Sequence, residues 1–458
     1  MSKRNKIIII IASIVLVLAI AAGLIWYFVF SDEARAKRQN EAFTPDENQG
    51  GAVVEKKAVT SEDGLWIYAL YSDKTVTLTG YKGEEKQLTV PDKVDGYTVT
   101  AIGVDCFNAN AVTKEITLPD TVTCLEGYAF YDAQVLEKIS IPDSVTSIKE
   151  GAFCFCKALT EITLPDGVTQ LPDGVFYGCD KLARIVLPKK LQSIGAHTFE
   201  SCVALTNITI PDAVITIGDE AFKNCTTLTE VILSESLSKV GEYIFNSCIL
   251  KKVTIPDSMS AIPAGMFCSC IYLEEAVLPD SITKIGSNAF YGCKSLKEIN
   301  IPKNLMELGD YAFFQCSSIE SIKLPESVAT VGNYLFTECT SLKSINIPSK
   351  LTYISPYMFA GCSSLTELEI PDSIEQIGDY AFSTANGFTE LTIPDSVTYI
   401  APYACSNMKN LKAIYVPDSV TEFGECWLGG STLVQVHCSK TSTAHEYCEA
   451  NKIPIFKD

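Results

Sequence analysis

The sequence of 458 residues carries a formal net charge of -19, with 47% hydrophobic and 20% charged residues. This composition excludes a disordered polyelectrolyte, and the negative charge excludes a general affinity for nucleic acid phosphates. With only 3 histidines, the chain offers little material for imidazole catalysis or histidine-based metal sites.

The N-terminal segment 7–30 contains no charged residue over 24 positions. That length suffices for an α-helix to cross a bilayer, which takes about 20 apolar residues. Lys3, Arg4 and Lys6 precede the segment, whereas the residues after it carry nearly balanced charge. We therefore predict a cytoplasmic tail at 1–6, a single transmembrane signal-anchor at 7–30, and export of the remainder.

A cleaved signal peptide is the alternative for this segment, because residues 19–21 have the small-x-small form of a cleavage site. The apolar run continues to Phe30, where a signal peptide should already be polar, and this favours the uncleaved anchor. Residues 31–63 are largely polar and include Pro45, Gly50 and Gly51, which predicts a flexible stalk.

A repeat dominates the rest of the chain. Proline recurs every 23 residues from Pro119 to Pro417, except that Ser234 takes one place and the next step, to Pro256, is 22 residues. Pro91 precedes the series by 28 residues. Apolar residues at six, three and one positions before the proline give the strand pattern of a leucine-rich repeat. The final period of two predicts that positions -3 and -1 point inward while -4 and -2 point outward.

A second apolar segment follows each proline at positions +3 and +6, and a glycine often comes next, as at Gly195 and Gly332. Glycine there suits a turn with positive φ or a close backbone approach. About fifteen coils at the usual strand spacing of about 4.8 Å predict one elongated, curved solenoid with a core of roughly 70 Å.

The runs at 141–156 and 370–382 show the repeat most completely, and they resemble the BspA-like, Treponema-type leucine-rich repeat family. The resemblance extends from about residue 64 to the C-terminus. It implies a repeat solenoid, mainly β with short irregular or 3₁₀ return segments. It also implies an N-terminal β cap at 64–90, repeats at 91–438 and a C-terminal cap at 439–458.

The C-terminal cap should contain a helix. Thr443 and Glu446 have the spacing of a capping box, which predicts a helix start at this point. Ala444, Tyr447 and Cys448 would then face the last coil and close the solenoid.

Two repeat positions are predicted to form buried columns. Phenylalanine recurs eleven residues after the proline, and stacked coils would bring these rings into one aromatic spine. The spine comprises Phe130, Phe153, Phe176, Phe199, Phe222, Phe245, Phe267, Phe290, Phe313, Phe336, Phe359 and Phe382.

Cysteine recurs fourteen residues after the proline, where Ala133 and Ala385 replace it in two coils. A small buried apolar residue belongs at such a position, so we expect free, slowly reacting thiols. Free thiols in an exported protein favour an anaerobic or reducing habitat. The ten cysteines are Cys156, Cys179, Cys202, Cys225, Cys248, Cys270, Cys293, Cys316, Cys339 and Cys362.

Disulfides or metal sites are the alternatives for a chain with 18 cysteines. Zinc sites need Cys-x-x-Cys pairs, whereas Cys154 with Cys156 and Cys268 with Cys270 are separated by one residue. Calcium needs several carboxylates, and the aspartate that often follows the proline supplies one per coil. We predict no metal and no cofactor.

The sequence predicts no enzyme, since His197, His437 and His445 lie in separate segments and phosphate-loop or metalloprotease motifs are absent. Catalysis would require a hidden pocket that joins distant residues.

The outward strand positions vary while the buried columns barely change, which is how solenoids adapt a fixed scaffold to a partner. Drift among exposed strand residues is the competing interpretation. Val186, Ile232 and Val277 are apolar and outward in the middle of the chain, among charged residues. The candidate protein-binding face comprises Arg184, Val186, Asn207, Thr209, Glu230, Ile232, Lys252, Thr254, Glu275 and Val277.

We therefore expect a membrane-anchored, extracellular leucine-rich repeat protein that binds a protein partner at the bacterial cell surface. The family resemblance implies adhesion to host matrix proteins or to bacterial surface proteins. A structural or spacer protein of the cell envelope, without a specific ligand, is the alternative.

Overall fold

The computed structural model describes residues 53–456. The predicted cytoplasmic tail, the predicted membrane segment 7–30 and most of the predicted stalk lie outside this range. Within residues 53–456, no helix combines the length and the apolar character that crossing a membrane requires.

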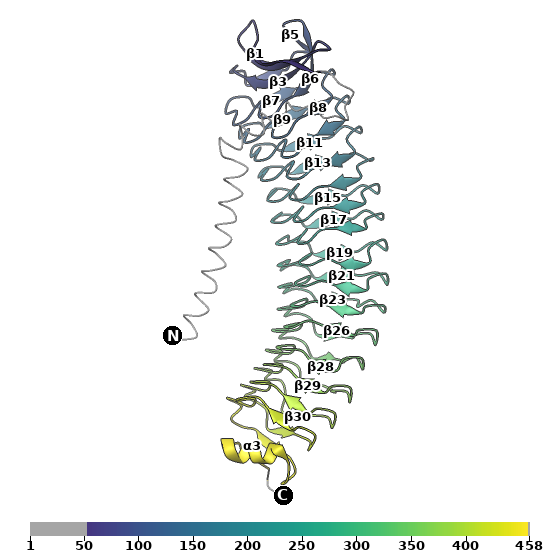
Figure 1. The fold of residues 1–458 in the computed structure, drawn as a ribbon, viewed down its shortest axis with the longest axis vertical. Coiled ribbons are helices and arrows are strands. Elements are labelled where there is room, and N and C mark those ends of the chain that lie inside the picture. The colour runs from purple at the N-terminus through teal and green to yellow at the C-terminus, as the bar shows by residue number, and fades with distance from the viewer. Residues whose placement is uncertain (1–52, 457–458) are drawn as a thin grey trace.

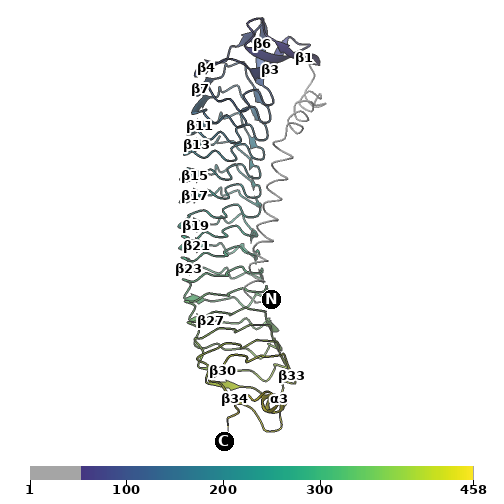
Figure 2. The same cartoon turned by 90° about the vertical axis from the view of Figure 1, so that its left-hand side faces the viewer.

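The described chain forms an elongated, gently curved column of stacked coils (Figure 1). Short strands line one side of the column, and the chain returns along the other side (Figure 2). This arrangement confirms the predicted β-rich leucine-rich repeat solenoid.

The N-terminal end is closed by strands β1 (Val54–Thr60), β2 (Trp66–Tyr71) and β3 (Thr75–Tyr81), which pair antiparallel in this order. Strand β3 pairs in parallel with β6 (Tyr97–Ile102), which also carries the antiparallel strand β5 (Lys93–Val94). Strand β1 lies inside the range 31–63 that was predicted as a stalk, so the cap starts before residue 64. Because most side chains of β1 are exposed and polar, its sequence is typical of a linker.

The predicted repeat strands pair in parallel within several short sheets, and partners are one repeat apart, as with Glu161 and Arg184. The middle residue of most of these strands is buried and its two neighbours are exposed, as the alternation predicted. The strands are β4 (Gln87–Thr89), β7 (Glu115–Thr117), β9 (Lys138–Ser140), β11 (Glu161–Thr163), β13 (Arg184–Val186), β15 (Asn207–Thr209), β17 (Glu230–Ile232), β19 (Lys252–Thr254), β21 (Glu275–Val277), β23 (Glu298–Ile299), β25 (Ser321–Ile322), β27 (Ser344–Ile345), β30 (Glu390–Thr392), β32 (Ala413–Tyr415) and β34 (Gln435–His437).

The return side consists mainly of irregular turns, as expected, and the described residues contain no 3₁₀ helix. The second apolar segment of each coil adds a two-residue strand, and these strands pair in parallel in several short sheets. Because the backbone of this segment is extended, successive side chains alternate in direction. The last apolar residue of the segment points into the core, and the residue before it points outward. These strands are β8 (Cys124–Leu125), β10 (Ser147–Ile148), β12 (Gln170–Leu171), β14 (Ser193–Ile194), β16 (Thr216–Ile217), β18 (Lys239–Val240), β20 (Ala261–Ile262), β22 (Lys284–Ile285), β24 (Glu307–Leu308), β26 (Thr330–Val331), β28 (Tyr353–Ile354), β29 (Gln376–Ile377), β31 (Tyr399–Ile400) and β33 (Glu422–Phe423).

The aromatic spine is confirmed. From Phe130 to Phe382 each ring stacks on the next, with centroids 5.0–6.2 Å apart and ring planes within 21° of parallel. All of these side chains are buried. Phe107 extends the stack by one coil toward the N-terminal cap.

The ten cysteines of the repeat are free and buried, as predicted. Each thiol also donates a hydrogen bond to the backbone carbonyl of the spine phenylalanine in the preceding coil, at 3.1–3.2 Å. Ser431 occupies the same repeat position near the C-terminus, and its hydroxyl donates to the Cys405 carbonyl at 2.8 Å. The column therefore holds small hydrogen-bond donors as well as small apolar side chains.

The glycines after the second apolar segment serve close packing, because none of them has a left-handed φ. A Cβ atom at Gly332 would lie 2.3 Å from the backbone nitrogen of Asp310 in the preceding coil. The left-handed residues come later, nine and thirteen residues after the proline.

The C-terminal end is capped by helix α3 (Thr443–Asn451). Its N-cap is Ser442, not Thr443 as predicted, because Ser442 has extended backbone angles and its Oγ accepts from the backbone N–H of His445 at 3.2 Å. Ala444 and Cys448 are buried against the last coil, which confirms the predicted capping face.

Candidate functional site

The strand face consists of the outward residues two and four positions before each proline. All ten residues of the candidate binding face lie on it, in β13, β15, β17, β19 and β21. The side chain of Val186 is 55% exposed and that of Ile232 is 54% exposed. The side chain of Val277 is less exposed, because it is half-buried. These side chains are available to a partner without any change in the core.

The ladder register decides which of these residues meet. Ile232 lies opposite Thr209, and Val277 lies opposite Thr254. Val186 lies opposite Thr163, outside the predicted set. The three apolar residues therefore alternate with threonines along the column and do not form one continuous patch. Across the β19–β21 pair, Lys252 Nζ contacts Glu275 Oε1 at 2.7 Å.

A second variable surface, the turn face, was not anticipated. It consists of the residues nine and twelve positions after the proline, just beyond the return strands. In every coil from Tyr128 to Cys426 the residue at +9 is left-handed, with φ between 51° and 63°. This conformation costs a residue with a side chain roughly 1–2 kcal/mol, and Gly151, Gly174 and Gly265 avoid that cost.

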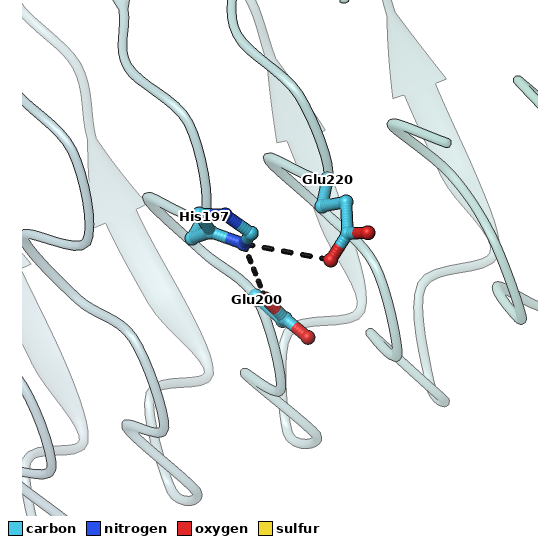
Figure 3. Close-up of side chains that lie close together, drawn as sticks. All are labelled: His197, Glu200 and Glu220. Atoms are coloured by element: carbon cyan, nitrogen blue, oxygen red, sulfur yellow. Dashed lines mark hydrogen bonds and ion pairs between the residues drawn. The ribbon is translucent and has the colours of Figure 1, made fainter. Parts of the chain in front are cut away.

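In the middle of the chain the turn face carries a charged cluster, drawn in Figure 3. His197 Nδ1 lies 2.6 Å from Glu200 Oε2 and 3.5 Å from Glu220 Oε2. Lys223 Nζ lies 2.7 Å from Glu220 Oε2 and 3.7 Å from Glu200 Oε1. The hydrogen bond to Glu200 raises the pKa of His197, so the imidazole favours its charged form.

These four groups could bind a divalent metal only if Lys223 moved. His197, Glu200 and Glu220 bring three ligand atoms within 4.8 Å of one another. The Lys223 ammonium already sits against both carboxylates, and two cations balance two anions. The arrangement is an ion-pair network between positions +9 and +12 of two neighbouring coils.

Toward the C-terminus the turn face carries a row of stacked tyrosines at +9. Successive ring centroids are 4.3–4.8 Å apart and the ring planes lie within 14° of parallel. Stacked aromatic pairs contribute about 0.5–1.5 kcal/mol, which offsets much of the left-handed strain. This tyrosine ladder comprises Tyr311, Tyr334, Tyr357, Tyr380 and Tyr403, all half-buried.

A cavity of about 390 Å³ lies between the cap sheet and the first coil. Tyr71, Asp105, Asn108 and Glu126 are among its lining residues, and Asn108 Nδ2 donates to Asp105 Oδ1 at 2.7 Å. None of the three histidines lines this cavity.

The profile of the BspA type leucine rich repeat region matches residues 86–205, 192–320, 260–388 and 306–435. A search of curated proteins gave no match.

Among solved structures, a leucine-rich repeat protein from Bacteroides ovatus is 29% identical with a TM-score of 0.71, covering 84% of this chain and 96% of that chain. A leucine rich cell surface protein from Faecalibacterium prausnitzii is 23% identical with a TM-score of 0.45, covering 88% of this chain and 99% of that one. A Treponema pallidum leucine-rich repeat protein is 20% identical with a TM-score of 0.26, and the match covers 63% of this chain and 92% of that chain.

Proposed function

This chain belongs to the BspA-type leucine-rich repeat family, and on that premise we propose that it is a binding scaffold displayed at a bacterial cell surface. Residues 7–30 anchor it in the membrane, and the solenoid extends outward to dock a protein partner. The apolar length of this segment and the lysines and arginine before it support the anchor and its orientation.

The observation that carries the binding role is the contrast between fixed and variable positions. Stacked phenylalanines and the thiol hydrogen bonds hold each coil in register with the next. Outward side chains on the short strands are therefore held at set spacings before a partner arrives, which lowers the entropy cost of association. The exposed columns vary in charge and polarity on this rigid frame.

The centre of the strand face is the proposed docking site. Val186 and Ile232 are the most exposed apolar anchors, and Val277 adds a smaller apolar surface. Charged residues surround them, with Arg184 and Glu230 on the same strands. A few central residues usually supply most of the binding energy in such an interface.

The test begins by identifying partners of the purified full-length protein among matrix proteins and cell-envelope extracts. The triple variant Val186→Thr, Ile232→Thr, Val277→Thr should fold normally, because the side chains point outward, and should weaken binding at least tenfold. The matched control Tyr415→Thr alters the same column near the C-terminal end and should leave affinity unchanged. A partner bound equally well by wild type and triple variant would exclude this site.

A spacer role in the cell envelope is the second candidate, favoured by the long column and its continuous aromatic spine (Figure 1). A spacer depends on length, so removing one complete coil should impair it while changes on the strand face should not. If changes on the strand face impair function in the same cells and removal of one coil does not, the docking role is supported.

A further inference from the structure

Each ring of the tyrosine ladder covers a face of its neighbour, so the half-buried rings can offer a partner their edges rather than their faces. The ladder's four steps of 4.3–4.8 Å give a row about 18 Å long, which matches roughly six residues of extended chain. Five consecutive coils keep tyrosine at a left-handed position where three earlier coils place glycine.

Acidic residues accompany this ladder, and basic residues are absent from its return segments. The segments 306–315, 329–338, 352–361, 375–384, 398–407 and 421–430 contain no lysine or arginine. Six of their acidic residues are exposed, and the seventh, Glu307, pairs with Lys284 of the preceding coil. The seven are Glu307, Asp310, Glu338, Glu375, Asp379, Glu422 and Glu425.

The carboxylates lie close to the rings. Asp310, Asp379 and Glu425 directly precede positions +9 in their coils and are exposed. Their charge contributes to the raised pKa of the neighbouring tyrosines, after burial at Tyr380 and as the first cause at Tyr403. The raised pKa keeps the phenols of Tyr380 and Tyr403 neutral, so their oxygens can accept hydrogen bonds.

Of the eight equivalent segments in the earlier coils, four carry one lysine each. Lys149, Lys223, Lys239 and Lys284 each stand on the return side of an earlier coil. The C-terminal turn face is therefore a distinct zone that combines aromatic surface with uncompensated negative charge. Within residues 53–456, this is the zone where tyrosines at +9 stack in parallel over five consecutive coils beside exposed carboxylates.

We infer that the tyrosine ladder and its flanking carboxylates bind an extended, lysine- or arginine-rich segment of a partner protein. The aliphatic stems of such side chains pack along ring edges, and their N–H groups reach phenol oxygens and carboxylates. Complementary charge favours this partner and disfavours acidic ones. This surface lies on the return side of the coil, so it is separate from the strand face and the two proposals fail independently.

The experiment measures binding of a fluorescein-labelled peptide, Arg-Ser repeated four times, to the full-length protein by fluorescence anisotropy. A Glu-Ser peptide of equal length is the negative probe. We expect the variant Asp310→Asn, Asp379→Asn, Glu425→Gln to bind the basic peptide about tenfold more weakly than wild type, since three charge pairs are lost.

The matched control is Glu367→Gln, Glu369→Gln, Glu390→Gln, which removes the same charge from exposed strand-side positions at the C-terminal end. It should change affinity less than twofold. If both triple variants weaken peptide binding equally, the affinity depends only on the net charge of the protein, and the inference is overturned.

The hydroxyl contribution is tested by Tyr334→Phe, Tyr357→Phe, Tyr380→Phe, which preserves stacking and should weaken peptide binding about threefold. Unfolding curves confirm that each variant is folded. Absence of basic-peptide binding by folded wild type would refute the proposal. Binding of neutral dextran instead, weakened by the same Tyr→Phe variant, would assign the ladder to glycans and equally overturn it.

Discussion

The cysteine column allows packing and hydrogen bonding to be separated at Cys248. Its thiol is buried, and Sγ–H donates to the Phe222 carbonyl at 3.2 Å. That carbonyl also accepts from the backbone N–H of Cys225 at 3.2 Å, so Cys248→Ala leaves no unsatisfied acceptor. The cost of Cys248→Ala is therefore about 1–2 kcal/mol, from lost burial and a small cavity.

Cys248→Ser should be at least as stable as Cys248→Ala, because its hydroxyl can donate to a carbonyl of the preceding coil, as Ser431 donates to Cys405. Urea unfolding followed by circular dichroism measures which variant is more stable. The unfolding midpoints can be compared directly if both variants have the same denaturant slope m. The exposed Cys426→Ala is the control and should shift stability by no more than about 0.5 kcal/mol. A serine variant less stable than alanine by more than about 1 kcal/mol would show that apolar packing alone determines the column.

The remaining predictions concern reactivity, the cap, pH and shape. Maleimide should label the exposed Cys426 within seconds and the ten column thiols only on unfolding. Burial blocks access to the column thiols and raises their pKa, as at Cys248. Rapid labelling of Cys248 in the folded protein would contradict this prediction. Deleting residues 439–458 should cause aggregation, because α3 and the β-bridge between Val436 and Ile455 cover the last coil. Light scattering of the truncated protein measures this aggregation. The raised pKa of His197 means that its ion pair stabilises the fold fully below about pH 6.5 and progressively less as pH rises through the folded-state pKa. Unfolding midpoints should therefore fall more between pH 6 and 9 in wild type than in His197→Asn. Small-angle scattering should show an elongated particle, and a compact sphere would exclude the solenoid.

The sequence was sufficient to predict the solenoid because every coil repeats the same apolar positions. The Phe130–Phe382 spine and the buried cysteines followed directly from their period. Strand β1 could not be predicted, since its exposed polar side chains are typical of a linker and its order comes from pairing with β2.

The turn face could not be predicted because its positions depend on backbone geometry rather than on hydrophobic period. Tyr311 and Tyr334 are 23 residues apart, but their stacking depends on the left-handed turn that orients the residue at +9. The His197 cluster likewise joins positions +9 and +12 across neighbouring coils. A sequence pattern marks these residues as variable, while only the turn conformation places them on one surface.

The contact between coils also has a genetic consequence. Each spine ring meets a ring of the same kind, and each column thiol bonds back by one coil, as at Cys293 and Phe267. Recombination that adds or removes one whole repeat would preserve both interactions on either side of the junction. We expect related strains to differ in coil number by whole units of about 4.8 Å, which would raise or lower the C-terminal surfaces relative to the cell. Under the proposed N-terminal anchor, the distance of these surfaces from the membrane would be a trait that selection can adjust without altering the design of the coil.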